Sequence, residues 1–188
     1  MPTTLKEYQL DIARRLKHAF GSVDVNYEWR SFDSRAEAYA PRLDIAVGPF
    51  ATGSSQFIGE FDALGRRHRS MVSALWRSHI SNVGREHVGP QSRESLDSAN
   101  LNARCFLAVE IENRGSRKHM LGGAVNAAAL GRIGVVVGWD VGTLRALVRL
   151  RRYLEFLRLV GKSSFGTKNL LIVSPEQLRV AVATFTTA

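Results

Sequence analysis

Hydrophobic residues recur every three or four positions near the start of the chain, which is the spacing of one face of an α-helix. The residues on this face are Leu5, Tyr8, Ile12, Leu16 and Phe20. Thr4 stands before them at the spacing to Glu7 that a capping box requires, and Gly21 follows them. The pattern therefore predicts a helix that begins after Thr4 and ends at Gly21.

A second apolar stripe at helical spacing extends from Phe57 to about Ile80. The arginines that lie off this stripe are Arg66, Arg67, Arg69 and Arg77. We therefore expect one helix with a basic outer surface. Residues 81–103 have no periodicity and are rich in Ser, Asn, Gly and charged side chains, so we expect a long loop there.

Short runs rich in β-branched and aromatic residues predict strands. These runs are Val23–Arg30, Leu43–Val47, Phe106–Glu112, Ile133–Trp139 and Asn169–Val173. Helical patterns separate or follow the later runs, at Ser116–Leu130, at Val141–Val160 behind Asp140, and after the Ser174-Pro175-Glu176-Gln177 capping sequence. The order predicts an α/β fold, with residues 1–188 forming a single domain around a central mixed β-sheet flanked by helices.

Composition narrows the class of protein. A chain of 188 residues with 45% hydrophobic content is long enough to bury a core. Cys105 is the single cysteine, which excludes an internal disulfide and a cysteine-based zinc cluster. No stretch approaches the roughly 20 apolar residues of a membrane span, so we expect a soluble, cytoplasmic protein without a membrane partner.

The charge is strongly basic and consists mostly of arginine. Five of the 26 basic residues are lysines, so 21 are arginines, against 17 acidic residues and a net charge of +9. Arginine binds phosphate through a planar fork, which favours a polyanionic partner. Arg145, Arg149 and Arg152 lie along one side of the 141–160 helix, where they predict either a surface that follows phosphates or a solvated basic face.

Three acidic residues interrupt apolar strands. Asp44 interrupts one strand, and Glu110 and Glu112 interrupt another at positions that share one face. If the two strands are neighbours, the three carboxylates gather and repel each other unless a cation neutralises them. Mg²⁺ or Mn²⁺ suits such oxygen ligands and can bridge to a phosphate. Taken singly, Asp44 also fits a strand-end acid held by a turn, and the two glutamates fit the exposed face of an edge strand.

Other conspicuous residues favour a packing role. Gly122 and Gly123 lie inside a helical pattern, where each costs about 1 kcal/mol relative to Ala, which indicates close packing on the sheet. Trp29, Trp76 and Trp139 lie in apolar segments and fit the core or an interface, with base stacking as the weaker alternative.

From residues Thr4–Trp139 the chain resembles the PD-(D/E)XK, restriction-endonuclease-like nuclease superfamily, whose core runs helix, strands, helix, strand. Two segments match the acidic motifs of the family: Pro41-Arg42-Leu43-Asp44 matches the first and Glu110-Ile111-Glu112 matches the second. Glu112 departs from the family pattern, which has lysine at this position. The resemblance places a helical insertion at about 55–103, between the motif strands, and a C-terminal extension at about 141–188.

The resemblance implies a metal-dependent DNA endonuclease with Asp44 and Glu110 as ligands of Mg²⁺ or Mn²⁺. Glu112 would bind metal or orient the attacking water. Lys118, at the start of the next helix, is the candidate that restores the missing charge, with His119 beside it as a second candidate. Glu7 is a possible fourth carboxylate, although the capping box explains it better. DNA contacts are expected from Arg66, Arg67, Arg69, Arg145, Arg149 and Arg152.

Two other functions stay open at this point. A catalytically inactive relative would keep the fold and its basic surfaces to hold DNA or to assemble a larger DNA-processing complex. For the active nuclease, cleavage of both strands would favour a homodimer. Alternatively, a doubly wound domain would bind a small phosphorylated ligand at a strand end. The segment Gly48–Gly53 lacks the lysine and spacing of a P-loop, which weakens that alternative.

Overall fold

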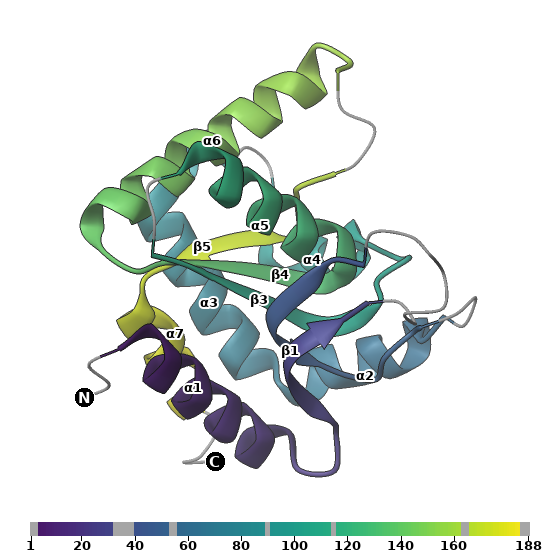
Figure 1. The fold of residues 1–188 in the computed structure, drawn as a ribbon. Coiled ribbons are helices and arrows are strands. Elements are labelled where there is room, and N and C mark those ends of the chain that lie inside the picture. Colours follow the sequence, from purple (N-terminus) through teal and green to yellow (C-terminus); the bar gives the residue numbers. More distant parts are fainter. Residues whose placement is uncertain are drawn as a thin grey trace.

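The computed structural model describes residues 4–31, 40–52, 56–88, 91–113, 116–162 and 166–184. The helices are α1 (Leu5–Phe20), α2 (Ile58–Arg67), α3 (Arg69–Val83), α4 (Leu96–Ala99), α5 (Arg117–Leu130), α6 (Val141–Leu159) and α7 (Pro175–Ala183). The strands are β1 (Val25–Arg30), β2 (Arg42–Val47), β3 (Cys105–Glu112), β4 (Gly131–Gly138) and β5 (Leu170–Val173). Figure 1 shows how these elements follow the sequence.

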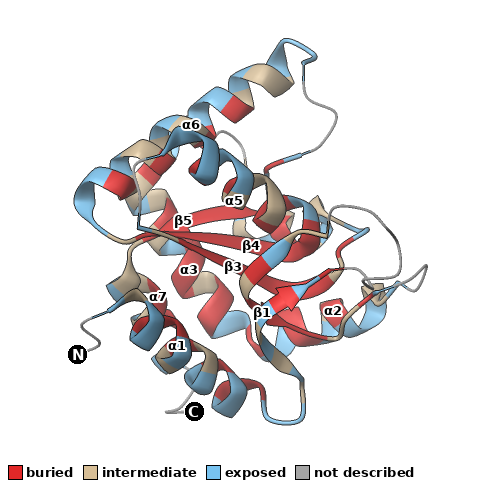
Figure 2. Ribbon diagram, in the orientation of Figure 1, coloured by how far each residue is buried: buried red, intermediate tan, exposed pale blue. Residues whose placement is uncertain are grey.

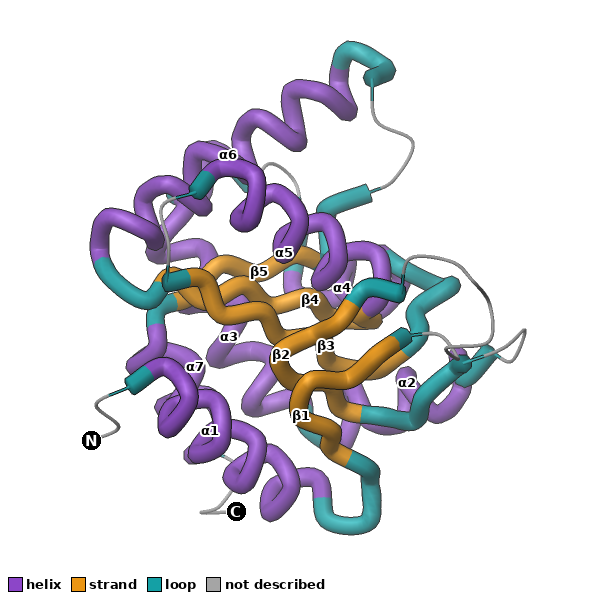
Figure 3. Tube along the Cα trace, viewed as in Figure 1, coloured by secondary structure: helices purple, strands orange, loops and turns teal. Residues whose placement is uncertain are grey.

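The strands form one five-stranded mixed sheet in the order β1-β2-β3-β4-β5, as Figure 3 shows in orange. The pairs β1–β2 and β2–β3 are antiparallel, whereas β3–β4 and β4–β5 are parallel. The expected α/β fold with a central mixed sheet is therefore confirmed. A doubly wound domain has a mostly parallel sheet, so the antiparallel half of this sheet argues against that alternative. Gly53, the last residue of the glycine segment considered for it, lies outside the described residues.

Helices cover both faces of the sheet. α5 and α6 lie on one face, and α1, α3 and α7 lie across the sheet from them (Figure 1). β4 and β5 are buried along their whole length, and β3 is buried up to Ile111. Figure 2 shows these three strands as the red centre of the molecule. Strands covered on both faces are apolar throughout, which makes the acids on β3 exceptional.

The helix starts match the capping signals in the sequence. The Thr4 hydroxyl accepts from the Glu7 N–H, and the Glu7 carboxylate accepts from the Thr4 N–H, each at 3.2 Å. Asp140 accepts from the Thr143 N–H at 2.7 Å and begins α6. Glu7 is thus confirmed as a capping residue, as the spacing indicated.

The helix expected from Phe57 to about Ile80 is instead two helices, so that expectation was wrong. α2 ends at Arg67 and α3 begins at Arg69, with His68 between them. The His68 ring is fully buried and stacks on Phe20 with ring centroids 3.9 Å apart. A tertiary contact with α1 therefore interrupts a segment whose local pattern is helical throughout.

Residues 81–103 are more ordered than the expected loop. The described part holds two 3₁₀ turns, Arg85–His87 and Arg93–Ser95, and the short helix α4, whose Leu96 is fully buried. The Asn100 amide donates to the carbonyl oxygens of Ala128, Ala129 and Gly131 at 2.9–3.1 Å. These hydrogen bonds tie the segment to the end of α5.

α3 also completes the β5 edge of the sheet. His79 Nδ1 accepts the Ile172 N–H at 3.0 Å, and the Asn82 amide donates to the Ile172 carbonyl at 3.0 Å. An unpaired strand edge invites pairing with other chains, and these two side chains satisfy it at Ile172. None of the described helices combines the length and apolar character needed to cross a bilayer.

Candidate active site on strands β2 and β3

Strands β2 and β3 separate at the point where the acids occur. Their last recorded backbone pair is Ile45 with Val109, so Asp44 and Glu110 are the next residue on each strand. The Asp44 carboxylate accepts the N–H of Ile111 at 2.7 Å, which is the role a backbone carbonyl plays elsewhere in a ladder. The Asp44 side chain on β2 is thereby held against the backbone of β3.

The structure brings Asp44, Glu110 and Glu112 together in one pocket with a volume of about 480 Å³. We call it the acidic pocket, and it is lined by Arg42, Asp44, Glu110, Ile111, Glu112, Asn113, Lys118, His119, Gly122, Gly123 and Asn126. Glu110 is only 8% exposed, and β3 lies in the middle of the sheet. The alternative of an exposed edge strand with ion-paired glutamates was therefore wrong.

Burial makes the charged form of Glu110 unfavourable. Desolvation raises the pKa of Glu110 well above 4.5, and the nearby charges of Asp44 and Glu112 raise it further. Hydrogen bonds from the Asn126 side chain and the Asp44 backbone act in the opposite direction. Burial, followed by the charge of Asp44, also raises the pKa of Glu112. Both glutamates are therefore favoured in the neutral form unless a cation lies beside them.

Burial has the largest effect on Asp44 and raises its pKa, whereas Ile111, Gln9 and Arg42 act in the opposite direction and favour the anion. Besides the Ile111 N–H, the side chain of Gln9 hydrogen-bonds Asp44. Gln9 lies on α1, is buried, and accepts from the Tyr27 hydroxyl at 3.4 Å. Sequence reasoning missed Gln9 and considered Glu7 instead. The available signal was a polar residue between the apolar positions Tyr8 and Ile12.

Helix α5 forms the wall of the acidic pocket. A Cβ at Gly123 would collide with a Glu112 carboxylate oxygen, and it would lie 3.6 Å from the Cβ of Glu110. Glycine at this position therefore leaves room for the acids. Gly122 is exposed with nothing within 4 Å of its Cβ position, so the expected close packing on the sheet does not occur there. Asn126, also missed in the sequence, follows Gly123 by one helical turn.

Basic side chains reach the rim of the pocket. Lys118 and His119 are exposed in the first turn of α5 and line the acidic pocket. Arg42 lines it as well and pairs with Glu28 at 3.3 Å. None of the salt bridges recorded for the described part of the chain includes Asp44, Glu110 or Glu112. The acids have cations nearby but no direct ion pair.

Oxygen ligands and negative charge suit a hard divalent cation. Within the ranges that the structure describes, no three His, Cys, Asp or Glu side chains are placed to hold one ion together. Mg²⁺ commonly uses one or two protein carboxylates and keeps several waters. Asp44 and Glu110, on adjacent strands, are the pair that fits this demand best, with Glu112 beside them.

The arginines expected to contact DNA lie outside the acidic pocket. Arg66, Arg67 and Arg69 are exposed at the junction of α2 and α3, where Arg69 pairs with Glu94 at 3.6 Å. A second set of exposed arginines lies on α6 and consists of Arg145, Arg149 and Arg152. α6 is on the same face of the sheet as α5, which carries Lys118 and His119 (Figure 1).

The tryptophans pack as the sequence indicated. Trp29 is buried and stacks on Phe50 with ring centroids 4.8 Å apart, and Trp76 is buried on α3. Trp139 contacts the Tyr8 ring edge-on at 5.4 Å. Trp29 and Trp76 thus belong to the interior, and Trp139 is partly buried and packs against the core.

Comparisons of the chain with protein-family models, with curated proteins and with solved structures gave no match. The resemblance to PD-(D/E)XK nucleases is accordingly carried by the motif residues Asp44, Glu110 and Glu112 and by the order of the elements.

Proposed function

We propose that this protein is a metal-dependent DNA endonuclease of the PD-(D/E)XK type, which hydrolyses phosphodiester bonds at the acidic pocket. The observation that carries the proposal is the buried Glu110 carboxylate, which shares its pocket with Asp44 and Glu112 without a recorded ion pair among the described residues. Ionising a buried carboxyl group that has no cationic partner costs stability. A site that pays this cost in stability is typical of a functional centre.

The order of the elements supports the same proposal. α1 precedes three strands with an acid on β2 and two acids on β3, and α5 and β4 follow. This is the order of the restriction-endonuclease-like core. In this interpretation α2, α3 and α4 fill the insertion of about 55–103, and α6, β5 and α7 form the extension of about 141–188.

Asp44 and Glu110 would hold Mg²⁺ or Mn²⁺, with Glu112 as a third oxygen donor. When bound, the cation supplies positive charge that neutralises the acids and polarises a phosphate oxygen. Gln9 and Asn126 orient Asp44 and Glu110 through their side-chain hydrogen bonds. Glu112 would accept a proton from the attacking water, whose oxygen bonds to phosphorus as the phosphorus–oxygen ester bond breaks, and the leaving oxygen takes up a proton from bulk water.

Basic residues at the rim would position the substrate. Lys118 and His119 contact the phosphate from the first turn of α5, and Lys118 supplies the charge that lysine at position 112 would otherwise give. The arginines at the α2–α3 junction and on α6 neutralise further phosphates. Such contacts make affinity fall steeply with salt.

A second candidate is an inactive relative that binds DNA or assembles a DNA-processing complex. Two observations favour it: Glu112 stands where the family has lysine, and the described residues contain no three-ligand arrangement. Calorimetric titration with Mn²⁺ separates the two candidates, because an active site binds the cation through Asp44 and Glu110. DNA affinity without cation binding would identify the inactive relative.

Hydrolysis is tested with supercoiled, linear and single-stranded DNA in Mg²⁺, Mn²⁺ or EDTA. The proposal requires cutting of at least one substrate with a divalent cation and none in EDTA. Sedimentation of the protein with and without duplex DNA shows whether two copies act together, as a cut in both strands favours.

A further inference from the structure

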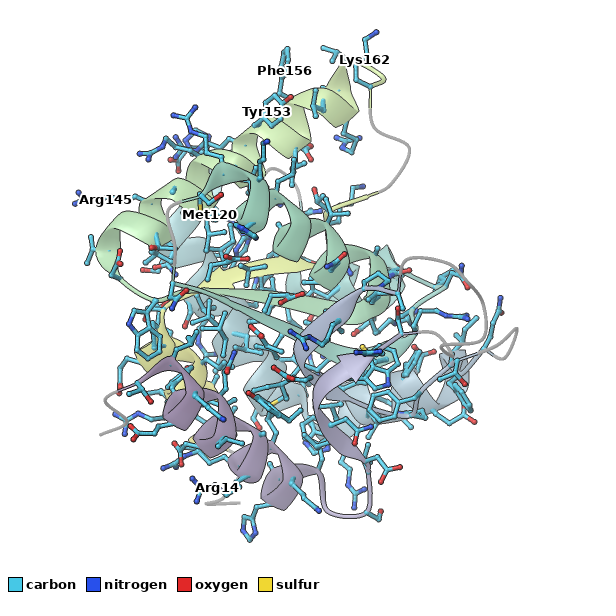
Figure 4. All side chains as sticks on the ribbon, viewed as in Figure 1. Arg14, Met120, Arg145, Tyr153, Phe156 and Lys162 are labelled. Carbon is cyan, nitrogen blue, oxygen red and sulfur yellow. The ribbon has the colours of Figure 1, made fainter. Side chains whose placement is uncertain are left out.

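The C-terminal half of α6 exposes an unusual set of large apolar side chains. Tyr153 is 52% exposed, Phe156 is 56% exposed and Leu159 is 69% exposed. Figure 4 shows that Tyr153 and Phe156 project from α6 away from the sheet. Exposed aromatic rings that lie together on one helix mark a contact surface more often than a single exposed apolar residue does.

These rings continue into a groove between α5 and α6 with a volume of about 420 Å³. Met120, Leu121, Leu150 and Tyr153 contribute apolar surface to the groove, and Arg117 and Arg149 contribute guanidinium groups. Arg145 is exposed one turn before Arg149, and Lys162 is exposed beyond the end of the helix (Figure 4). We call the groove, which includes Tyr153, together with Phe156 and Arg145 the α6 platform.

The α6 platform adjoins the acidic pocket through the first two turns of α5. Arg117 and Leu121 line the groove, whereas Lys118 and His119 line the acidic pocket. Consecutive residues of one helix thus serve both surfaces. The basic start of α5 therefore lies between the platform and the acids.

The charge of the platform favours a polyanion over a second copy of the chain. Glu155 is the only acid on α6, and Arg158 already binds it at 2.6 Å. A two-fold contact through this face would therefore bring the arginines of both copies together without acidic partners, which is unfavourable. Guanidinium groups beside exposed rings match a chain of phosphates with stackable bases.

We propose that the α6 platform binds a single-stranded stretch of nucleic acid, with bases stacked on Tyr153 and Phe156 and phosphates on Arg145 and Arg149. The proposal rests on the proposed function in one respect, because it makes the platform the path by which a strand enters the acidic pocket. Duplex bases are already stacked on each other, so free rings offer more to an unpaired strand.

Binding of a fluorescent 30-residue oligothymidylate in EDTA tests the platform without requiring cleavage. The double variant Tyr153→Ala, Phe156→Ala is expected to bind at least about tenfold more weakly. The variant Tyr153→Phe, Phe156→Tyr keeps both rings and is expected to bind like the wild type. Val180→Ala removes a side chain that is 51% exposed on α7, across the sheet, and serves as the matched control.

Salt dependence separates stacking from phosphate contact. Arg149→Gln is expected to reduce the slope of log affinity against log salt by about 0.7, the value for one phosphate of a single strand. The double aromatic variant is expected to keep the wild-type slope. Unchanged oligothymidylate affinity in the double aromatic variant would overturn the proposal, as would a wild-type dimer that this variant converts to monomer with its DNA affinity intact.

The outcome for the platform is distinguishable from the outcome for the nuclease. Ring-dependent binding of oligothymidylate without cleavage would support the platform and leave the acidic pocket without its proposed activity. Cation-dependent cutting of duplex DNA by a protein that does not bind oligothymidylate would support the nuclease and overturn the platform.

Discussion

The Asp44 carboxylate accepts the backbone N–H of Ile111 at 2.7 Å across the gap between β2 and β3. The Asp44 side chain therefore has two roles. It is a proposed cation ligand, and it also joins β2 to β3, the two strands that carry the acids. Substitutions at Asp44 consequently affect folding as well as chemistry. Any functional test at this position must separate the two effects.

Asp44→Asn and Asp44→Ala separate them. Asparagine keeps an oxygen that accepts the Ile111 N–H, whereas alanine leaves that N–H without its acceptor. We expect Asp44→Ala to lower the free energy of unfolding by roughly 1–3 kcal/mol and Asp44→Asn to lower it by less. Urea unfolding measures both values. Equal losses in the two variants would show that the hydrogen bond contributes little.

Glu110→Gln is expected to change how stability depends on pH. Burial and the neighbouring acids raise the folded-state pKa of Glu110 above 4.5. Protonated Glu110 therefore contributes fully to the free energy of unfolding below pH 4.5. This contribution to stability is lost as the pH rises through the raised pKa. Glutamine cannot ionise, and we therefore expect Glu110→Gln to match wild type near pH 4. At pH 8 it should be more stable than the wild type.

Chemical denaturation at a series of pH values tests this expectation. Mn²⁺ at pH 8 provides the control, since it should stabilise the wild type and leave Glu110→Gln unchanged. Wild-type and variant stabilities that stay parallel from pH 4 to pH 8 would mean that Glu110 titrates normally.

Gly123→Ala places a methyl group where the Glu112 carboxylate now lies. We expect this variant to displace Glu112 and to weaken Mn²⁺ binding by about tenfold, a typical loss when the geometry around a metal ligand is disturbed. Gly122→Ala is the matched control because Gly122 lines the same pocket but nothing lies within 4 Å of its added methyl. It should gain roughly 0.8–1 kcal/mol from helix propensity and keep its cation affinity. Titration calorimetry compares them, and equal affinities would contradict the proposed role of Glu112.

His79 is expected to remain neutral in the folded protein well below the ordinary pKa of histidine. Burial lowers its pKa from 6.5 to about 3, followed by the effect of Arg151, and its Nδ1 accepts the Ile172 N–H. A depressed pKa gives stability above pH 6.5 that is lost as pH falls toward 3, by up to about 1.4 kcal/mol per pH unit. His79→Asn keeps an acceptor without a titrating ring, so wild type should lose stability relative to it over this range. An NMR titration with a folded-state pKa near 6.5 would contradict this.

Local signals explain why most of the fold could be predicted. Thr4, Asp140 and Ser174 are capping residues whose partners lie three positions away, so sequence spacing alone defines those helix starts. The break at His68 depends on stacking with Phe20, a residue on a different element. Such a contact leaves no periodic trace, and the segment was therefore predicted as one helix.

The candidate site was predictable only where strand geometry determines it. Glu110 and Glu112 share a face because side chains alternate along a strand, and the resemblance supplied Asp44 as their neighbour. Gln9 could not be placed, because its contact with Asp44 depends on where α1 crosses the sheet. A Cβ at Gly123 would meet the acids and one at Gly122 would not, and this depends on how α5 is rotated about its axis against β3. The weak apolar pattern of the α5 sequence does not define that rotation.

The most direct test of the proposed endonuclease is a time course of supercoiled plasmid cleavage in Mg²⁺ or Mn²⁺. The wild type is compared with Asp44→Asn, with Glu110→Gln and with Glu60→Gln, which alters an exposed acid on α2 outside the acidic pocket. We expect wild type and Glu60→Gln to convert the plasmid to nicked or linear forms, and both pocket variants to fall to the EDTA background. Plasmid left intact by the folded wild type under every cation condition, or cut equally well by both pocket variants, would contradict the assignment of nuclease activity to Asp44 and Glu110.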